Sequence, residues 1–221
     1  MSAPLKLAMF DCDGTLVDSQ HHIVRAVVEA WARHDLPPPT AEMVRTGIGL
    51  PLYDAIARLH PEGDADLHQA LTDAYKSVFT VMRQQPDHWE PLYPGVVETL
   101  DALAEAGWLL GIATGKAKRG LLATLNQHKL LDRFVVLRTA DDGPGKPNPD
   151  MLLTAMAEIG VEPANTVMIG DTSYDIEMAR SADTMAIGVS WGYHTVPVLQ
   201  AAGAHHIVHD YVALADILRA S

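Results

Sequence analysis

Acidic residues follow two of the apolar runs in this sequence. Asp11 and Asp13 come directly after residues 6–10, and Asp171 follows a later run, with Asp175 four residues further on. Carboxylate oxygens are the ligands that Mg²⁺ takes in proteins, usually one or two of them together with substrate phosphate and several waters. The four acids therefore predict a magnesium site that also receives a phosphate group.

Two further residues could hold that phosphate. Thr114 ends another apolar run, and Lys146 lies in the stiff Gly/Pro segment 143–147. A hydroxyl and an ammonium can bind phosphoryl oxygens as negative charge shifts in the transition state. A neighbouring carboxylate can act as nucleophile and divide one difficult displacement into two easier ones, while a second carboxylate moves the protons. This combination predicts phosphoryl transfer.

Short apolar runs are the strands expected to position these side chains. They span residues 6–10, 108–113, 166–169 and 184–189, with weaker candidates at 134–137 and 206–208. Helical spacing of apolar residues lies between several of them, at 96–103, 121–125 and 151–159. Strands that alternate with helices predict a doubly wound, Rossmann-like α/β core with a parallel sheet. Ligands of such sheets bind beyond the carboxyl ends of the strands, where the acids lie.

Residues 20–85 interrupt this alternation because they contain helical patterns and no convincing strand. One apolar stripe at helical spacing lies within residues 23–31 and another within 67–82. We therefore expect a small all-helical cap domain at 20–85, inserted into a core domain made of residues 1–19 and 86–221.

Composition restricts the partners and the compartment. The 221 residues carry 16 basic and 28 acidic side chains, a formal net charge of −12, which disfavours nucleic acid and anionic membranes as partners. A single cysteine, Cys12, excludes an internal disulfide and a zinc cage, and we interpret it as a small side chain packed near the site. No run resembles a signal peptide or a membrane span, so we expect a cytoplasmic protein. The sequence is compatible with a monomer or a homodimer.

Four segments together resemble the motifs of the haloacid dehalogenase-like superfamily. They are DCDGTLVDS at 11–19, GIATGK at 111–116, GKPNPD at 145–150 and GDTSYD at 170–175. All four occur in the order of that family, and the likeness covers essentially the whole chain. The position of the helical insert is similar to that of the cap in the phosphoglycolate phosphatase-like branch.

The resemblance implies a role for each acid. Asp11 would be the nucleophile and a Mg²⁺ ligand, and Asp13 the general acid/base, with its backbone carbonyl also on the metal. Asp171 would ligate the metal, and Asp175 would support it directly or through water. Taken alone, Asp175 would suit a helix start, where the macrodipole favours an acid. The dehalogenases of the superfamily lack the second acid of the first motif, so Asp13 favours phosphoryl transfer.

The resemblance also implies phosphate-binding and substrate-selecting residues. Thr114, Gly115 and Lys146 would bind the phosphoryl group. Arg45, in the expected cap, and Lys116, directly after the second motif, are candidates for selecting the leaving group, since a cation there would suit an acidic one.

Several other patterns fail on spacing. The acidic run that starts at Asp11 has glycine in its fourth position and His22 in its twelfth, which excludes a calcium-binding loop. Residues 111–116 lack both the glycine spacing and the following Ser or Thr of a P-loop. His205, His206 and His209 have no acid paired with them, and we interpret them as surface residues.

The sequence thus predicts a magnesium-dependent phosphatase that acts on a small phosphorylated metabolite through an aspartyl-phosphate. Phosphoglycolate is the first candidate substrate, by branch resemblance alone. Two alternatives stay open: a sugar phosphomutase of the same fold, and a non-catalytic phosphate-binding regulatory protein.

Overall fold

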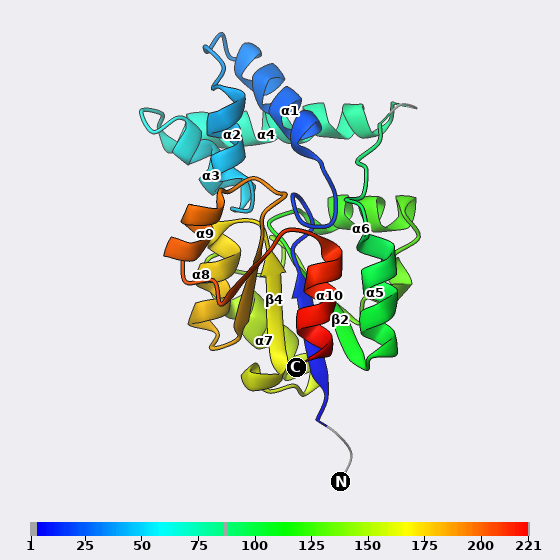
Figure 1. Cartoon of the computed structure of the whole chain (residues 1–221). Coiled ribbons are helices and arrows are strands. Elements are labelled where there is room, and N and C mark those ends of the chain that lie inside the picture. The colour runs from blue at the N-terminus through cyan, green and yellow to red at the C-terminus, as the bar shows by residue number, and fades with distance from the viewer. Residues whose placement is uncertain (1–3, 86–87, 221) are drawn as a thin grey trace.

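The computed structural model describes residues 4–85 and 88–220, which form a sheet core with a layer of helices beyond one edge (Figure 1). The six strands are β1 Lys6–Phe10, β2 Trp108–Ala113, β3 Val136–Arg138, β4 Thr166–Gly170, β5 Met185–Val189 and β6 His206–Val208. They pair in the order β3-β2-β1-β4-β5-β6, and every pair is parallel. The predicted α/β fold is confirmed. Both weaker strand candidates are also strands, although β3 begins two residues later than predicted.

The centre of the sheet sets the position of the acids. β1 lies between β2 and β4, and Phe10 is level with Ile112 on one side and Ile169 on the other. The order of the strands reverses at this point, because the chain moves outward from β1 in one direction and from β4 in the other. In open α/β sheets, the crevice at such a switch point receives the ligand.

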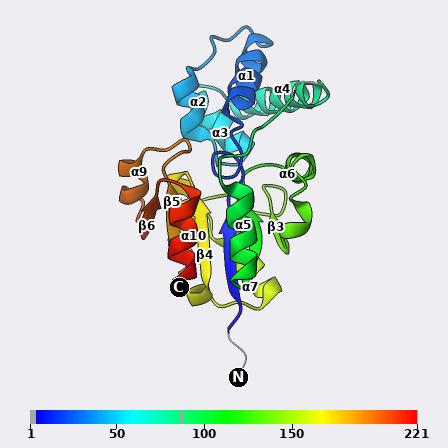
Figure 2. The same cartoon turned by 45° about the vertical axis from the view of Figure 1, so that its right-hand side comes forward.

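Helices cover both faces of the sheet. They are α5 Val96–Glu105, α6 Lys118–Gln127, α7 Asp150–Ile159, α8 Ser173–Ser181, α9 Val196–Ala201 and α10 Tyr211–Arg219, with short 3-10 turns at Leu131–Arg133 and Pro163–Asn165. Because successive strand residues point to opposite faces, Phe10 packs with α5 and α10, while Met9 packs with α7 and α8. The two views show α5 and α10 on the same face of the sheet (Figures 1 and 2).

The layer beyond the sheet edge contains the helices between β1 and β2. They are α1 Gln20–Ala32, α2 Ala41–Gly47, α3 Leu52–Leu59 and α4 Ala65–Arg83. Trp31, Ile56 and Leu71 are buried in a small apolar core of their own. Both figures place this layer, called the cap below, above the carboxyl ends of β1 and β4. The predicted boundary between 85 and 86 stays a prediction, since residues 86–87 lie outside the described residues. None of the described helices is both long and apolar enough to cross a membrane.

Candidate active site

The ends of the central strands bring three predicted residues together. Asp11 follows β1, Thr114 follows β2 and Asp171 follows β4, and each is at most 1% exposed. The Asp11 amide still donates to the Ile169 carbonyl at 2.9 Å, so the sheet pairing continues into the site. The strands therefore fix the backbone beneath these side chains.

Three carboxylates gather at this edge. Asp11, Asp171 and Asp175 each offer an oxygen within 4.8 Å of the others, and all three residues are buried. Burial raises the pKa of Asp11 to about 6, and the Asp175 carboxylate adds to that rise against the opposing effect of Lys146. Burial, and then the Asp11 charge, also raise the pKa of Asp171. Buried like charges disfavour each other's ionised form, so this group calls for a cation.

Lys146 supplies one positive charge to the group. Its side chain is completely buried, with Nζ 2.9 Å from Asp11 Oδ1 and 2.5 Å from Asp175 Oδ1. Burial disfavours its charge, but the two carboxylates outweigh that effect and raise the pKa of Lys146. Below, Lys146, Asp11, Asp171 and Asp175 are called the Lys146 cluster.

The Lys146 cluster fits a divalent cation. It holds three carboxylates to one ammonium, and oxygen donors of this kind are what hard divalent cations take. Asp11 Oδ2 is buried and has no hydrogen-bond partner among the described residues. A buried carboxylate oxygen without a partner is costly unless a ligand completes its surroundings, so this atom points to the ligand side.

Asp171 is oriented by two donors. The Thr15 hydroxyl donates to Asp171 Oδ1 at 2.8 Å, and the Tyr193 amide donates to Oδ2 at 2.9 Å. Gly14 has φ +87°, and a Cβ at that position would clash with Asp171 Oδ2. Glycine is therefore required there, both for the backbone conformation and for the approach of the carboxylate.

Asp175 has two roles through its two oxygens. Oδ2 accepts from the Thr172 amide at 3.0 Å and the Thr172 hydroxyl at 2.7 Å, as part of a capping box at the start of α8. Oδ1 faces Lys146 instead. The helix-start interpretation and the site interpretation are therefore both compatible with the structure.

The Asp13 carboxylate is not part of the Lys146 cluster. Its Oδ1 accepts from the Ser19 hydroxyl at 2.7 Å and from Lys116 Nζ at 2.6 Å. The Asp13 carboxylate therefore stands apart from the proposed metal group. That its backbone carbonyl ligates a metal stays a prediction.

Lys116 also contacts a buried acid, Glu90, that the sequence analysis did not single out. Glu90, 1% exposed, lies 3.3 Å from Lys116 Nζ through Oε2, which also accepts from the Thr124 hydroxyl at 2.7 Å. Burial opposes its charge, yet Lys116 and Thr124 together lower the pKa of Glu90. Lys116, Asp13 and Glu90 are called the Lys116 cluster below. Nothing in the spacing of Glu90 marks it, because its partners come from distant parts of the chain.

A cavity of about 540 Å³ joins the two clusters to the cap. Asp11 and Asp13 line its core side together with Thr114, Gly115 and Lys116. A Cβ on Gly115 would lie 2.6 Å from the Gly49 carbonyl oxygen and 2.8 Å from that of Leu50, so the cap loop rests directly on the predicted phosphate loop.

Arg45 is not among the residues that line this cavity. Its Nε donates to Gln20 Oε1 at 2.8 Å. The cations that line the cavity from the helices are Lys76, Arg83 and Arg119. Selection of the leaving group by Arg45 stays a prediction, and the structure does not place it toward the substrate side.

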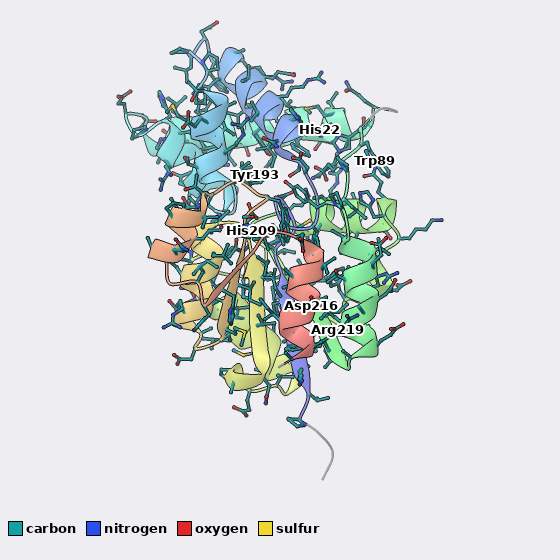
Figure 3. The ribbon with its side chains drawn as sticks, viewed as in Figure 1. His22, Trp89, Tyr193, His209, Asp216 and Arg219 are labelled. Carbon is teal, nitrogen blue, oxygen red and sulfur yellow. The ribbon has the colours of Figure 1, made fainter. Side chains whose placement is uncertain are left out.

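The junction between cap and core also contains residues that the motifs did not mark. Tyr193 lies there, with its hydroxyl 3.3 Å from Ser19 Oγ (Figure 3). His209 lies on the core, where its Nδ1 is 2.7 Å from Ser190 Oγ. Among the described residues, the Asp11, Asp171 and Asp175 group is the only set of three or more potential metal ligands, so the C-terminal histidines form none.

A family model described as haloacid dehalogenase-like hydrolase matches residues 8–189, which is most of the chain. The chain belongs to this hydrolase family. The predicted family is therefore confirmed.

Named relatives of this hydrolase cover nearly its full length. It is 37% identical over 208 residues to a protein named "Probable phosphatase IndB" from Dickeya dadantii, covering 93% of this chain and 90% of that protein. It is 31% identical to a phosphoglycolate phosphatase from Vibrio vulnificus, covering 98% and 97% of the two chains. The crystal structure of a protein named "Putative haloacid dehalogenase-like hydrolase" from Bacteroides fragilis superposes with a TM-score of 0.88 at 27% identity, covering 95% of this chain and 99% of that chain.

Proposed function

We propose that this hydrolase is a magnesium-dependent phosphatase that cleaves a small phosphomonoester through an aspartyl-phosphate on Asp11. The observation that carries the proposal is Asp11 Oδ2, a buried carboxylate oxygen without a partner among the described residues. It belongs to a strand-end residue that lines the cavity and lies beside a buried ammonium. The relatives named phosphatase support the same reaction class.

In the first half of the reaction, Asp11 Oδ2 attacks phosphorus and the bond from phosphorus to the leaving oxygen breaks. Asp13 gives its proton to that oxygen, which leaves as an alcohol. Lys146 and the Thr114 hydroxyl hold the phosphoryl oxygens during the transfer. Bound Mg²⁺, held by Asp11, Asp171, Asp175 and the Asp13 carbonyl, would screen the charge of the phosphate from the attacking carboxylate.

In the second half, Asp13 takes a proton from a water molecule, whose oxygen attacks phosphorus. The bond from phosphorus to Asp11 breaks, and inorganic phosphate leaves. The cap lies over this chemistry and restricts the access of bulk water, as lids do in other enzymes.

Phosphoglycolate is the first substrate to test, because several relatives are named phosphoglycolate phosphatase. The cavity also has room for larger esters. Its volume of about 540 Å³ lies within the range of about 300–1,000 Å³ that is typical of small-molecule sites. Its cap side is largely apolar, with Val27, Ile56 and Phe79 among the walls. Phosphate esters with an apolar leaving group should therefore be tested alongside phosphoglycolate.

The experiment measures inorganic phosphate released from phosphoglycolate, sugar phosphates and aryl phosphates, with Mg²⁺ and with chelator. We expect turnover only with the metal, and none from Asp11→Asn. Asp216→Asn is the matched control, since Asp216 is an exposed residue of α10 far from the site (Figure 3). Full activity in chelator or in Asp11→Asn would contradict the proposal. An isomerised sugar phosphate without free phosphate would indicate a mutase.

A further inference from the structure

The Lys116 cluster connects Asp13 to the segment that returns from the cap. Lys116 Nζ lies 2.6 Å from Asp13 Oδ1 and 3.3 Å from Glu90 Oε2. The side chains of Asp13, Lys116 and Glu90 are 12%, 6% and 1% exposed, so water screens these ion pairs little. Glu90 lies in the described part of the linker between α4 and α5. Neither the reaction outlined above nor the family motifs assign a task to Glu90.

The contacts of Asp13 fix one oxygen and leave the other available. Oδ1 is held by both the Ser19 hydroxyl and Lys116 Nζ. No hydrogen bond reaches Oδ2 from any residue in the described ranges, and Asp13 lines the cavity. A carboxyl group held in this way presents Oδ2, and the proton that Oδ2 carries in the first half of the reaction can pass to a leaving oxygen in the cavity.

Lys116 is itself held in place. Its ammonium lies between two carboxylates, and its backbone amide donates to the Thr114 hydroxyl at 3.3 Å. An ammonium paired on both sides is poorly suited to binding an acidic leaving group, which was its predicted role. Its geometry instead suits holding Asp13.

Glu90 is fixed by partners on α6 and next to it. The Thr124 hydroxyl donates to Oε2 at 2.7 Å, and His128 Nε2 lies 2.7 Å from the Glu90 carbonyl oxygen. If Glu90 lost its charge, Lys116 would keep only Asp13 as a carboxylate partner and would no longer be held between two buried acids. The position of Lys116 therefore depends on Glu90.

We propose that Glu90, acting through Lys116, is a positioning residue that holds the Asp13 carboxyl group, whose proton passes to the leaving oxygen. The inference rests on the proposed phosphatase reaction. It predicts a selective defect, because only a basic leaving oxygen needs a proton from Asp13 as it departs.

The test compares two esters of similar shape. The leaving group of 4-nitrophenyl phosphate is a stable phenolate, whereas 4-nitrobenzyl phosphate must release a strongly basic alkoxide. The quantity measured is kcat/KM in the presence of Mg²⁺, which includes the step in which the leaving group departs. Glu90→Gln and Lys116→Met are expected to lower kcat/KM for the benzyl ester about tenfold more than for the phenyl ester.

A double-mutant cycle tests whether Glu90 acts through Lys116. Glu90→Gln should add nothing to the benzyl-ester defect in a Lys116→Met background, since the intermediary is already lost. Thr99→Val is the control for loss of a buried hydrogen bond away from Asp13, because the Thr99 hydroxyl donates to the Tyr211 carbonyl. We expect it to affect both esters equally. If Glu90→Gln does not fold, Thr124→Val loosens Glu90 without unpairing a charge and should give a smaller defect of the same selectivity.

The outcomes separate this inference from the proposed function. If the wild-type protein turns over neither ester with Mg²⁺, the phosphatase proposal fails for such esters. If it turns over both and the variants lose equal activity on both, the positioning role is overturned and Glu90 is purely structural. Additive defects in the cycle would also overturn it.

Discussion

The candidate site contains two buried lysines, and each is paired with two carboxylates. In the Lys116 cluster, one ammonium serves Asp13 and Glu90, and the pKa of Glu90 is lowered although the residue is buried. In the Lys146 cluster, one ammonium serves three carboxylates, and burial raises the pKa of Asp11 to about 6. The difference indicates where positive charge is missing. The three carboxylates of the Lys146 cluster fit a cation. The ion pairs of the Lys116 cluster instead hold the Asp13 side chain in place.

The largest expected difference between the two clusters is in the activity lost when each lysine is replaced. Lys146→Met is expected to lower kcat for 4-nitrophenyl phosphate about 10²- to 10³-fold, because it would remove a donor proposed to hold the transferring phosphoryl group. Lys116→Met should lower it only a few fold on this ester, whose leaving group needs no proton. Steady-state kinetics at saturating Mg²⁺ measure both. Equal losses would show that the clusters do not differ in this way.

Cation binding should stabilise the protein through one cluster only. A ligand at about 100 times its Kd adds about 2.7 kcal/mol, which corresponds to a rise of roughly 5–10 °C in Tm for a chain of this size. We expect thermal unfolding with and without Mg²⁺ to show such a shift for the wild type and for Glu90→Gln. Asp171→Asn should abolish it. A shift that survives Asp171→Asn would place the cation elsewhere.

The residues of the Lys146 cluster, which the sequence singled out, lie together in the structure for a physical reason. Parallel strands end at one edge, so residues that follow β1 and β4 must meet there even though 160 residues separate Asp11 from Asp171. Their types then suggest the chemistry. The same argument placed Thr114, and Lys146 was inferred from its stiff loop.

The Lys116 cluster was not predictable in the same way. Glu90 lies on a linker, which has no periodicity, and its contact with Lys116 depends on how the returning segment packs against α6. The contacts of Asp13 with Ser19 and Lys116 likewise depend on tertiary packing. Arg45 shows the converse, since a cation in the right segment bonds to a neighbouring helix instead.

The glycine before each lysine gives a test of how the cap contacts the two clusters. A Cβ on Gly115 would press on the backbone of Gly49 and Leu50, and one on Gly145 would clash with the ring of Pro51. We expect Gly115→Ala and Gly145→Ala each to lower the free energy of unfolding by about 1–3 kcal/mol, as overpacking does. Urea denaturation measures this.

Gly47→Ala is the matched control for these substitutions. Its Cβ would meet Ala55 at 3.6 Å, an ordinary contact, so we expect a change of no more than about 1 kcal/mol. If Gly115→Ala and Gly145→Ala behave like Gly47→Ala, the cap loop does not rest on these glycines in solution.

The smallest expected effect is a pH dependence of stability that arises from two histidines beside the Lys116 cluster. His22 of α1 and His88 of the returning linker meet edge to face with ring centroids 4.3 Å apart, and the Nδ1 atoms of both are buried without a hydrogen-bond partner among the described residues. Burial lowers the pKa of both imidazoles, against the opposing charge of Glu90. His21, Arg25, Arg83 and Lys116 are the cations that act on one or both of them.

Because both histidines are neutral more readily in the folded than in the unfolded state, the unfolded chain binds more protons just below its own histidine pKa of about 6.5. Their contribution to stability is therefore complete above that pH and is lost as the pH falls below it. His88→Phe keeps an aromatic ring and should reduce the fall in Tm between about pH 7.5 and 5.5. His206→Gln, at an exposed position of β6, should leave that fall unchanged. If His88→Phe leaves the fall in Tm unchanged as well, titration of His88 does not cause the loss of stability at low pH.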